Sequence, residues 1–249
     1  MRIPVIRGVI DRRILANYRV APDVLSRVLP RPFRPQIVNG FGIAGICLIR
    51  LHRIRPRFLP SLLGISSENA AHRIAVEWDA DGERHSGVFI PCRDTSSRLF
   101  TLAGGRIFSG VHNHAHFDVR EDDGHFHVTM DSLDDSARVV VDGEIATDLP
   151  SDSIFSSVVD VSRFFESGSL GYSPNSSNGH FGGLELRTFN WTVEPLAIHR
   201  IESSFFDDRK MFPAGSVALD NALLMRSIEH EWHSRDTLCC LGGDEQSVA

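Results

Sequence analysis

The sequence predicts a single α+β domain that consists mainly of antiparallel β-strands. Its 249 residues are 42% hydrophobic, which suits one large domain. Most apolar runs are short and alternate with polar residues, as half-buried strands do. The dipeptides Asp81-Gly82 and Asp123-Gly124 lie between such runs and favour tight hairpins.

The first half of the chain predicts strands around one short helix. Residues 9–20 have a strand-like pattern, and Pro22 suits the first position of a helix over residues 21–30. Residues 41–54 predict a long strand, with glycines that permit a bend or a close backbone approach. Residues 72–91 predict a hairpin.

The second half predicts more strands and two further helices. Gly168 is a typical stop for a helix over residues 157–168. Residues 216–235 have apolar positions at helical spacing and predict a second, longer helix. We interpret residues 169–183, a polar and glycine-rich stretch, as a loop that either covers a pocket as a lid or lies on the surface. Further strands are expected over residues 105–118, 124–131, 136–146, 184–190 and 191–205. We place all of residues 1–249 in one domain, with residues 237–249 as a flexible tail.

Composition excludes several classes of protein. The formal net charge is −6, so the chain lacks the basic face that nucleic acid requires. No run approaches the roughly 18 apolar residues that span a bilayer. The first 15 residues carry charges throughout their apolar run, unlike a signal peptide, and we therefore expect a cytoplasmic protein with reduced cysteines that binds neither membrane nor nucleic acid. The sequence leaves open a disulfide between Cys47 and Cys92 and assembly into a homo-oligomer.

The stretch GVHNHAHF, residues 110–117, places histidines at every second position. Because side chains alternate along a strand, His112, His114 and His116 share one face. If Asp123-Gly124 forms a two-residue turn, Asp118 pairs with Thr129 and one face of the hairpin is polar throughout. The histidine row is then either a solvated strand face or, with further ligands, a metal site.

Asn113 is the exception on the apolar face of this hairpin. An unpaired polar side chain on a buried face costs roughly 1–3 kcal/mol, so Asn113 needs a partner. That partner is either a neighbouring core group or a ligand.

Several long blocks resemble the uncharacterised DUF2071 family. They are ISSENAAHRIAVEW, GVFIPCRDTSSRLFTLAGGRIFSGVHNHAHF, LGYSP and FDDRKMFPAGSVALDNALLMRSIEHEW, and the resemblance runs from about Arg13 to Trp232. The family is remotely similar to acetoacetate decarboxylase. This resemblance implies a β-barrel-like assembly of antiparallel strands around an internal apolar pocket, with a few outer helices.

The remote resemblance also implies site residues. Acetoacetate decarboxylase carries a pocket lysine that forms a Schiff base, in a block that begins with Gly-Arg. Matched to Gly105-Arg106, that block places the lysine at Asn113 and a second lysine at His114. The pocket glutamate of the relatives falls on Glu68, although serine replaces the tyrosine that precedes it by two residues.

This chain departs from the relatives at the reactive position. A Schiff base needs a primary amine, which Asn113 lacks. The only lysine, Lys210, lies among charged residues that predict an exposed turn. Amine-dependent chemistry is therefore not carried over to this chain.

Three further groups contain chemically capable side chains. Arg93 or Arg98 could bind a carboxylate through its two guanidinium nitrogens, or form a surface ion pair. Glu68 and His72 are an acid/base pair only if both point inward. His230 and His233 are spaced by three residues, unlike the four of a metalloprotease helix, and indicate a charged surface.

The sequence thus predicts a small-molecule protein that needs no cofactor or metal. One hypothesis is a lyase-like acid/base enzyme acting on a carbonyl or carboxylate compound. In it Glu68 moves a proton, Asn113 stabilises an enolate oxygen, and His114 stands beside them. Arg93, Arg106 and His112 are the expected ligand-binding residues. The alternative hypothesis is a ligand carrier or sensor without turnover.

Overall fold

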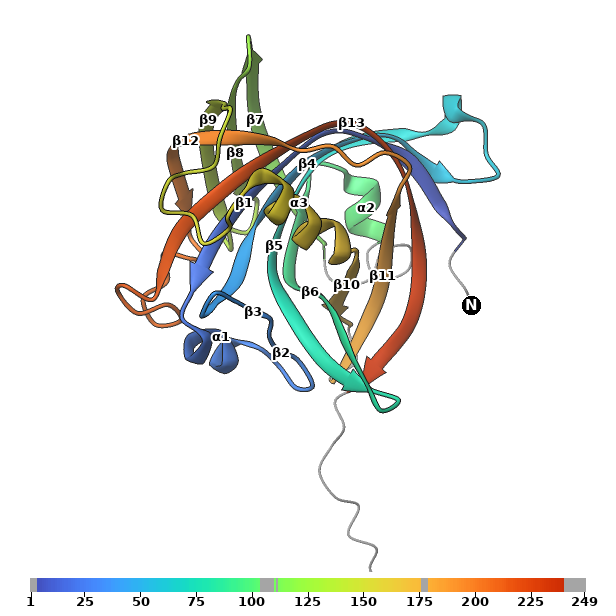
Figure 1. The fold of residues 1–249 in the computed structure, drawn as a ribbon. Helices are drawn as coiled ribbons and strands as arrows, with labels where there is room; N and C mark the ends of the chain where they lie inside the picture. The colour runs from blue at the N-terminus through green and yellow to red at the C-terminus, as the bar shows by residue number, and fades with distance from the viewer. Residues whose placement is uncertain (1–3, 104–109, 111, 176–178, 240–249) are drawn as a thin grey trace, which may run out of the picture.

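The computed structural model describes residues 4–103, 110, 112–175 and 179–239. Strands dominate these ranges, and three α-helices and one 3₁₀ turn accompany them (Figure 1). The helical elements are α1 (Pro22–Val28), η1 (Ser61–Leu63), α2 (Arg98–Ala103) and α3 (Val158–Ser167). The strands are β1 (Ile6–Val20), β2 (Arg34–Pro35), β3 (Ile37–Val38), β4 (Phe41–Pro56), β5 (Ile65–Ala80), β6 (Glu83–Thr95), β7 (His112–Asp122), β8 (His125–Ser132), β9 (Arg138–Ile145), β10 (Leu170–Pro174), β11 (His180–Thr188), β12 (Glu194–Ser203) and β13 (Val217–Cys239).

The strands form one extended sheet whose pairings return to β13 by two routes. β13, β1, β4, β5 and β6 pair in that order, each antiparallel to the next. From β6 one route leads through β10 and β11 back to β13. The other leads through β7, β8, β9 and β12 to β13. The five shared strands are therefore covered on both faces.

The two hydrophobic clusters reflect this arrangement. Ile14, Ile46 and Leu224 belong to one cluster, whereas their chain neighbours Leu15, Cys47 and Leu223 belong to the other. Because successive side chains of a strand point to opposite faces, the shared strands carry a buried core on each side.

The predicted fold class is confirmed as a mainly antiparallel α+β structure. The hairpin of β7 and β8 has the expected register, with Asp118 opposite Thr129 and Asp122 opposite His125. Asp123 and Gly124 both have positive φ at its turn, as the Asp-Gly signal implies. The expected helices at residues 21–30 and 157–168 are present as α1 and α3.

The prediction of a helix over residues 216–235 is wrong, because this segment forms β13. Its residues Asp220 to Met225 are buried without interruption, since β13 has neighbours on both edges and a core on both faces. A run that is buried on both faces does not alternate between apolar and polar residues, so it fits helical spacing as well as strand spacing. Thr237 to Cys239, which we assigned to the tail, also lie in β13. The remainder of the expected tail lies outside the described residues.

The expected loop over residues 169–183 also needs correction. Its first part is β10, and β11 begins at His180. Tyr172 is buried in the core and packs edge-on against Trp78, so it does not lie in a lid. Within the described part of the chain, no helix is both long enough and apolar enough to cross a membrane.

Candidate functional site

A cavity of about 160 Å³ lies between the shared strands and the segment from α3 to β11. α3 lies across this part of the sheet (Figure 1) and contributes Phe165 to the lining. The helix begins at Ser157, whose hydroxyl accepts a hydrogen bond from the Asp160 amide, as helix N-caps do. Trp191, another lining residue, donates from its indole nitrogen to the Ser162 hydroxyl of α3 over 2.9 Å, which fixes the helix at the cavity.

The cavity wall is largely apolar. Most of its apolar side chains come from β4, β6 and β11, and Trp232 of β13 completes the wall. Those from the three strands are Ile49, Leu51, Val88, Ile90, Leu184 and Leu186. An apolar cavity with a few polar groups is the usual form of a small-molecule site.

Four lining residues form one transverse row across the sheet. Cys47 of β4 pairs with Ala71 of β5, Ala71 pairs with Arg93 of β6, and Arg93 pairs with His112 of β7. Directly paired residues point to the same face, and neighbouring strands lie about 4.8 Å apart. The short side chain of Ala71 therefore leaves space between Cys47 and Arg93.

Three arginines also line the cavity, and the described residues offer them neutral hydrogen-bond partners. Arg13 donates from Nε to the Cys47 sulfur over 3.4 Å. Arg73 donates to the amide oxygen of Asn17, and Arg93 donates to the Ser173 hydroxyl over 3.2 Å and 3.3 Å.

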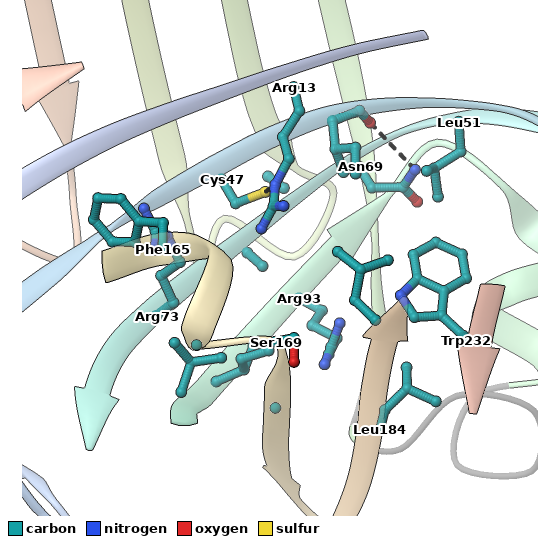
Figure 2. Close-up of a pocket in the computed structure, with 18 of the residues that line it drawn as sticks. Arg13, Cys47, Leu51, Asn69, Arg73, Arg93, Phe165, Ser169, Leu184 and Trp232 are labelled. Carbon is teal, nitrogen blue, oxygen red and sulfur yellow. Dashed lines mark hydrogen bonds between the residues drawn. The ribbon is translucent and has the colours of Figure 1, made fainter. Parts of the chain in front are cut away.

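Figure 2 shows how these arginines lie. Arg13 is beside Cys47, Arg73 is beside Phe165, and Arg93 extends from β6 toward the same space. The Arg73 guanidinium stacks on the Phe165 ring at 4.5 Å from its centroid. Its Nε is buried and has no hydrogen-bond partner among the described residues.

Burial opposes the charge of two of these arginines. Loss of solvent lowers the pKa of Arg73 to about 9 and that of Arg93 to about 10. Both side chains still carry a positive charge at pH 7. Arg73 and Arg93 form no ion pair with any of the described residues, and Asp94 and Glu166 also contribute to the lining of the cavity.

His112 is the half-buried imidazole among the described residues that line the cavity. Burial, together with the nearby Arg93 charge, lowers its pKa to about 4, so the ring is neutral at pH 7. Its Nδ1 lies 3.3 Å from the carbonyl oxygen of Gly110, which can only accept. When the neutral ring donates from Nδ1 to this carbonyl oxygen, Nε2 is its basic nitrogen.

The structure brings together two of the residues predicted from the sequence, since Arg93 and His112 both line the cavity. Arg106 lies outside the described residues. Asn113 is half-buried and is not among the described lining residues; it shares its strand face with Ala115, which belongs to the other hydrophobic cluster. His114 lies 3.3 Å through Nε2 from the Ser96 carbonyl oxygen and is also outside the lining.

Glu68 lies in an ion-pair cluster instead of the cavity. Its carboxylate accepts from Arg12 over 2.6 Å and from Arg50 over 2.5 Å. Glu121 completes the cluster by pairing with the same two arginines. Glu68 is separated from the cavity because it alternates along β5 with Asn69, Ala71 and Arg73, which line it. We expected Glu68 and Asn113 to contact the same ligand. The structure does not bring these two side chains together.

The histidine row does not share one environment. His112 lines the cavity, His114 is half-buried, and His116 is exposed. Among the described residues, no group of three or more His, Cys, Asp or Glu side chains is arranged to hold a metal ion. Cys47 and Cys92 are both free thiols in the structure.

Sequence reasoning missed Arg13, Arg73 and Cys47. Arg73 and Arg13 stand directly before the short apolar runs IAV and IL, at positions that a two-residue period assigns to a buried face. An arginine at a position that the pattern assigns to a buried face can be recognised in the sequence as a candidate site residue. Which of the two buried faces surrounds the cavity depends on the pairing of distant strands.

Comparison with known proteins establishes the family. The model of DUF2071, a family of uncharacterized conserved proteins, matches residues 10–210, and the chain belongs to this family. No curated protein matches the chain.

Solved structures show the same fold at low identity. Acetoacetate decarboxylase from Legionella pneumophila is similar with a TM-score of 0.59 and 12% identity, over 94% of this chain and 88% of that one. The enduracididine biosynthesis enzyme MppR, in complex with pyruvate, has a TM-score of 0.61 and 9% identity, over 96% and 91%. An acetoacetate decarboxylase-like enzyme from Sphingomonas wittichii RW1 has a TM-score of 0.59 and 10% identity, over 96% and 93%. The chain thus has the acetoacetate decarboxylase-like fold.

Proposed function

We propose that the cavity binds a small organic carboxylate that also carries a carbonyl group, inside the barrel-like enclosure expected from the family resemblance. The observation that supports this most directly is the convergence of Arg13, Arg73 and Arg93 with only neutral partners among the described residues. A carboxylate there forms charge-assisted hydrogen bonds, which are stronger than neutral ones. The apolar wall contacts the remainder of the ligand.

We further propose that the protein is an enzyme-like acid/base catalyst. His112 is neutral at pH 7, and its Nε2 is suited to accept a proton from the carbon next to the carbonyl group. The positive charge of Arg93 then stabilises the enolate that forms. This role replaces those that the sequence suggested for Glu68, Asn113 and His114.

No lysine is among the described cavity residues, and the single lysine of the chain, Lys210, is exposed. The proposed chemistry accordingly uses no Schiff base. A ligand carrier or sensor without turnover is the second candidate, because strong anion binding needs only the arginines.

Calorimetric titration tests the binding proposal. Saturated, 2-oxo and 3-oxo carboxylates of two to eight carbons are compared with their uncharged amides. We expect the acids to bind and the amides to bind at least ten-fold more weakly, because a hydrogen bond to a charged group contributes about 1.5–3 kcal/mol. Equal affinity for acids and amides contradicts the proposal.

Matched variants separate the cavity from general charge effects. Arg93→Met should weaken acid binding about ten-fold or more. Arg120→Met removes the same charge from an exposed Arg120–Asp118 pair far along β7 and should leave binding unchanged. If Arg93→Met and Arg120→Met change the affinity for the acid equally, the anion binds outside the cavity.

Proton exchange distinguishes an enzyme from a carrier. In deuterium oxide, an acid/base catalyst exchanges the hydrogens next to the ligand carbonyl faster than buffer does, and nuclear magnetic resonance detects the loss of the proton signal. His112→Phe should abolish exchange. Tight binding without accelerated exchange favours the carrier.

A further inference from the structure

Cys47 has an unusual position among the three described cysteines. It lies in the middle of β4, lines the cavity and has a relative exposure of 7%. Its sulfur accepts a hydrogen bond from Arg13. Arg93 lies in the same transverse row, separated only by Ala71.

The other two described cysteines have different surroundings. The Cys92 sulfur lies 3.1 Å from the Nδ1 of His72, and burial raises the pKa of this thiol to about 12, which makes it inert. Cys239 is exposed near the end of β13, 3.1 Å from the Nδ1 of His180. Of the described thiols, Cys47 is therefore the one that lines the cavity and lies among guanidinium groups.

A second observation points to a space beside Cys47 that suits an anion. Arg73 is more than nine-tenths buried and lines the cavity, and its Nε has no partner within the described part of the chain. Arg73 and Arg93 line the same cavity as Cys47, so a carboxylate that contacts their guanidinium groups lies beside the Cys47 sulfur. Cysteine sulfur is a strong nucleophile toward electrophilic carbon.

We propose that Cys47 is a nucleophile that forms a reversible covalent adduct with the carbonyl carbon of the bound carboxylate. The Cys47 sulfur forms a bond to the carbonyl carbon, the C=O π bond breaks, and the thiol proton moves to the oxygen. The product is a hemithioketal when the carbonyl group is a ketone and a hemithioacetal when it is an aldehyde. Since the addition has no leaving group and no change of oxidation state, it requires no further reactant. This inference goes beyond anion binding but depends on the proposed anion site for the orientation of the ligand.

Alkylation of the unmodified protein tests the reactivity of Cys47. Iodoacetate and iodoacetamide both transfer a two-carbon group to sulfur with loss of iodide, but only iodoacetate carries a carboxylate. We expect the peptide that contains Cys47 to be alkylated at least ten-fold faster by iodoacetate than by iodoacetamide, as followed by mass spectrometry. Cys239, in the same sample, is the internal control and should show no such preference for the anionic reagent.

Direct detection of the adduct completes the test. A 2-oxo carboxylate labelled with ¹³C at its carbonyl carbon should lose part of its carbonyl resonance on binding and gain a resonance of a tetrahedral carbon bonded to oxygen and sulfur. Cys47→Ser should lack that resonance. If the ligand binds but its carbonyl resonance is unchanged, or if Cys47 shows no preference for iodoacetate, the inference is overturned.

Saturated carboxylates distinguish this failure from failure of the proposed function. They have no electrophilic carbon, so their binding depends on the arginines alone, and they should slow the alkylation of Cys47 by iodoacetate. Calorimetric binding of saturated carboxylates without iodoacetate preference overturns the role of Cys47 and leaves the anion site intact. If saturated carboxylates do not bind and Cys47 shows no preference for iodoacetate, both the anion site and the role of Cys47 are overturned.

Discussion

Replacing Arg73 by methionine should stabilise the protein while impairing ligand binding. Arg73 carries a buried positive charge whose hydrogen-bond partner among the described residues is the neutral Asn17 amide. Its pKa of about 9 lies well below the value of about 12.5 that arginine has in water. At about 1.4 kcal/mol per pKa unit, the buried charge costs about 5 kcal/mol.

This cost applies fully at neutral pH. A side chain whose pKa is lower in the folded state binds its proton less tightly there, so the cost is present below pH 9 and declines as the pH rises above it. Methionine has an unbranched side chain, so it fills much of the same space without a charge.

The substitution also removes two favourable interactions of Arg73, which reduces the gain in the free energy of unfolding. Removing the guanidinium leaves the Asn17 oxygen without that donor, at about 1–3 kcal/mol, and loses the contact with the Phe165 ring, at about 1–2 kcal/mol. The net change in the free energy of unfolding is then a gain of about 0–3 kcal/mol, centred near 1.5 kcal/mol. At about 2–4 °C per kcal/mol for a chain of this length, the central value corresponds to a rise in Tm of about 3–6 °C.

Urea denaturation at pH 7 and calorimetric titration with a 2-oxo carboxylate measure the two effects. Arg12→Met is the matched control, because Arg12 is equally buried but pairs with Glu68 and Glu121. Breaking that cluster should destabilise the protein by about 3 kcal/mol and leave anion affinity unchanged. If Arg73→Met lowers stability by more than about 1 kcal/mol, or binds the anion as the parent does, Arg73 is a structural residue and the reasoning is refuted.

Three further predictions concern acid stability and the residues outside the cavity. Burial lowers the pKa of His72, His112 and His230 to about 4, so the unfolded chain binds more protons below pH 6.5 and stability falls as the pH falls from 6.5 to 4. Urea denaturation at pH 7 and pH 5 should show a loss of about 2 kcal/mol for each histidine, and a flat profile contradicts their burial as neutral rings. Glu68→Gln should destabilise the protein by about 3 kcal/mol in the same assay without changing anion affinity; a lost affinity with intact stability instead restores Glu68 as a site residue. Asn113→Leu should keep anion affinity within about two-fold in calorimetric titration, since Asn113 is not among the described lining residues, and a larger loss places it at the ligand.

The local features of this protein can be predicted from its amino-acid sequence. The Asp-Gly pair at residues 123–124 and the alternation on each side of it specified the register of β7 and β8, because a two-residue turn leaves one pairing that keeps the apolar side chains together. Pro22 marked the start of α1, and Gly168 marked the end of α3. Both signals depend on backbone preferences that act within a few residues. Long shared blocks indicated the family without any knowledge of contacts.

The residues that surround the cavity cannot be predicted from the sequence, because they depend on how distant strands pair. Glu68 and Arg73 stand five residues apart in one strand, yet one joins an ion-pair cluster and the other lines the cavity. Both faces of this strand are buried, so alternation alone cannot tell which face holds a ligand. β13 was mistaken for a helix for a related reason. Neighbours from distant parts of the chain bury residues Asp220 to Met225 on both faces, so this run lacks the alternation of apolar and polar residues that distinguishes a strand from a helix.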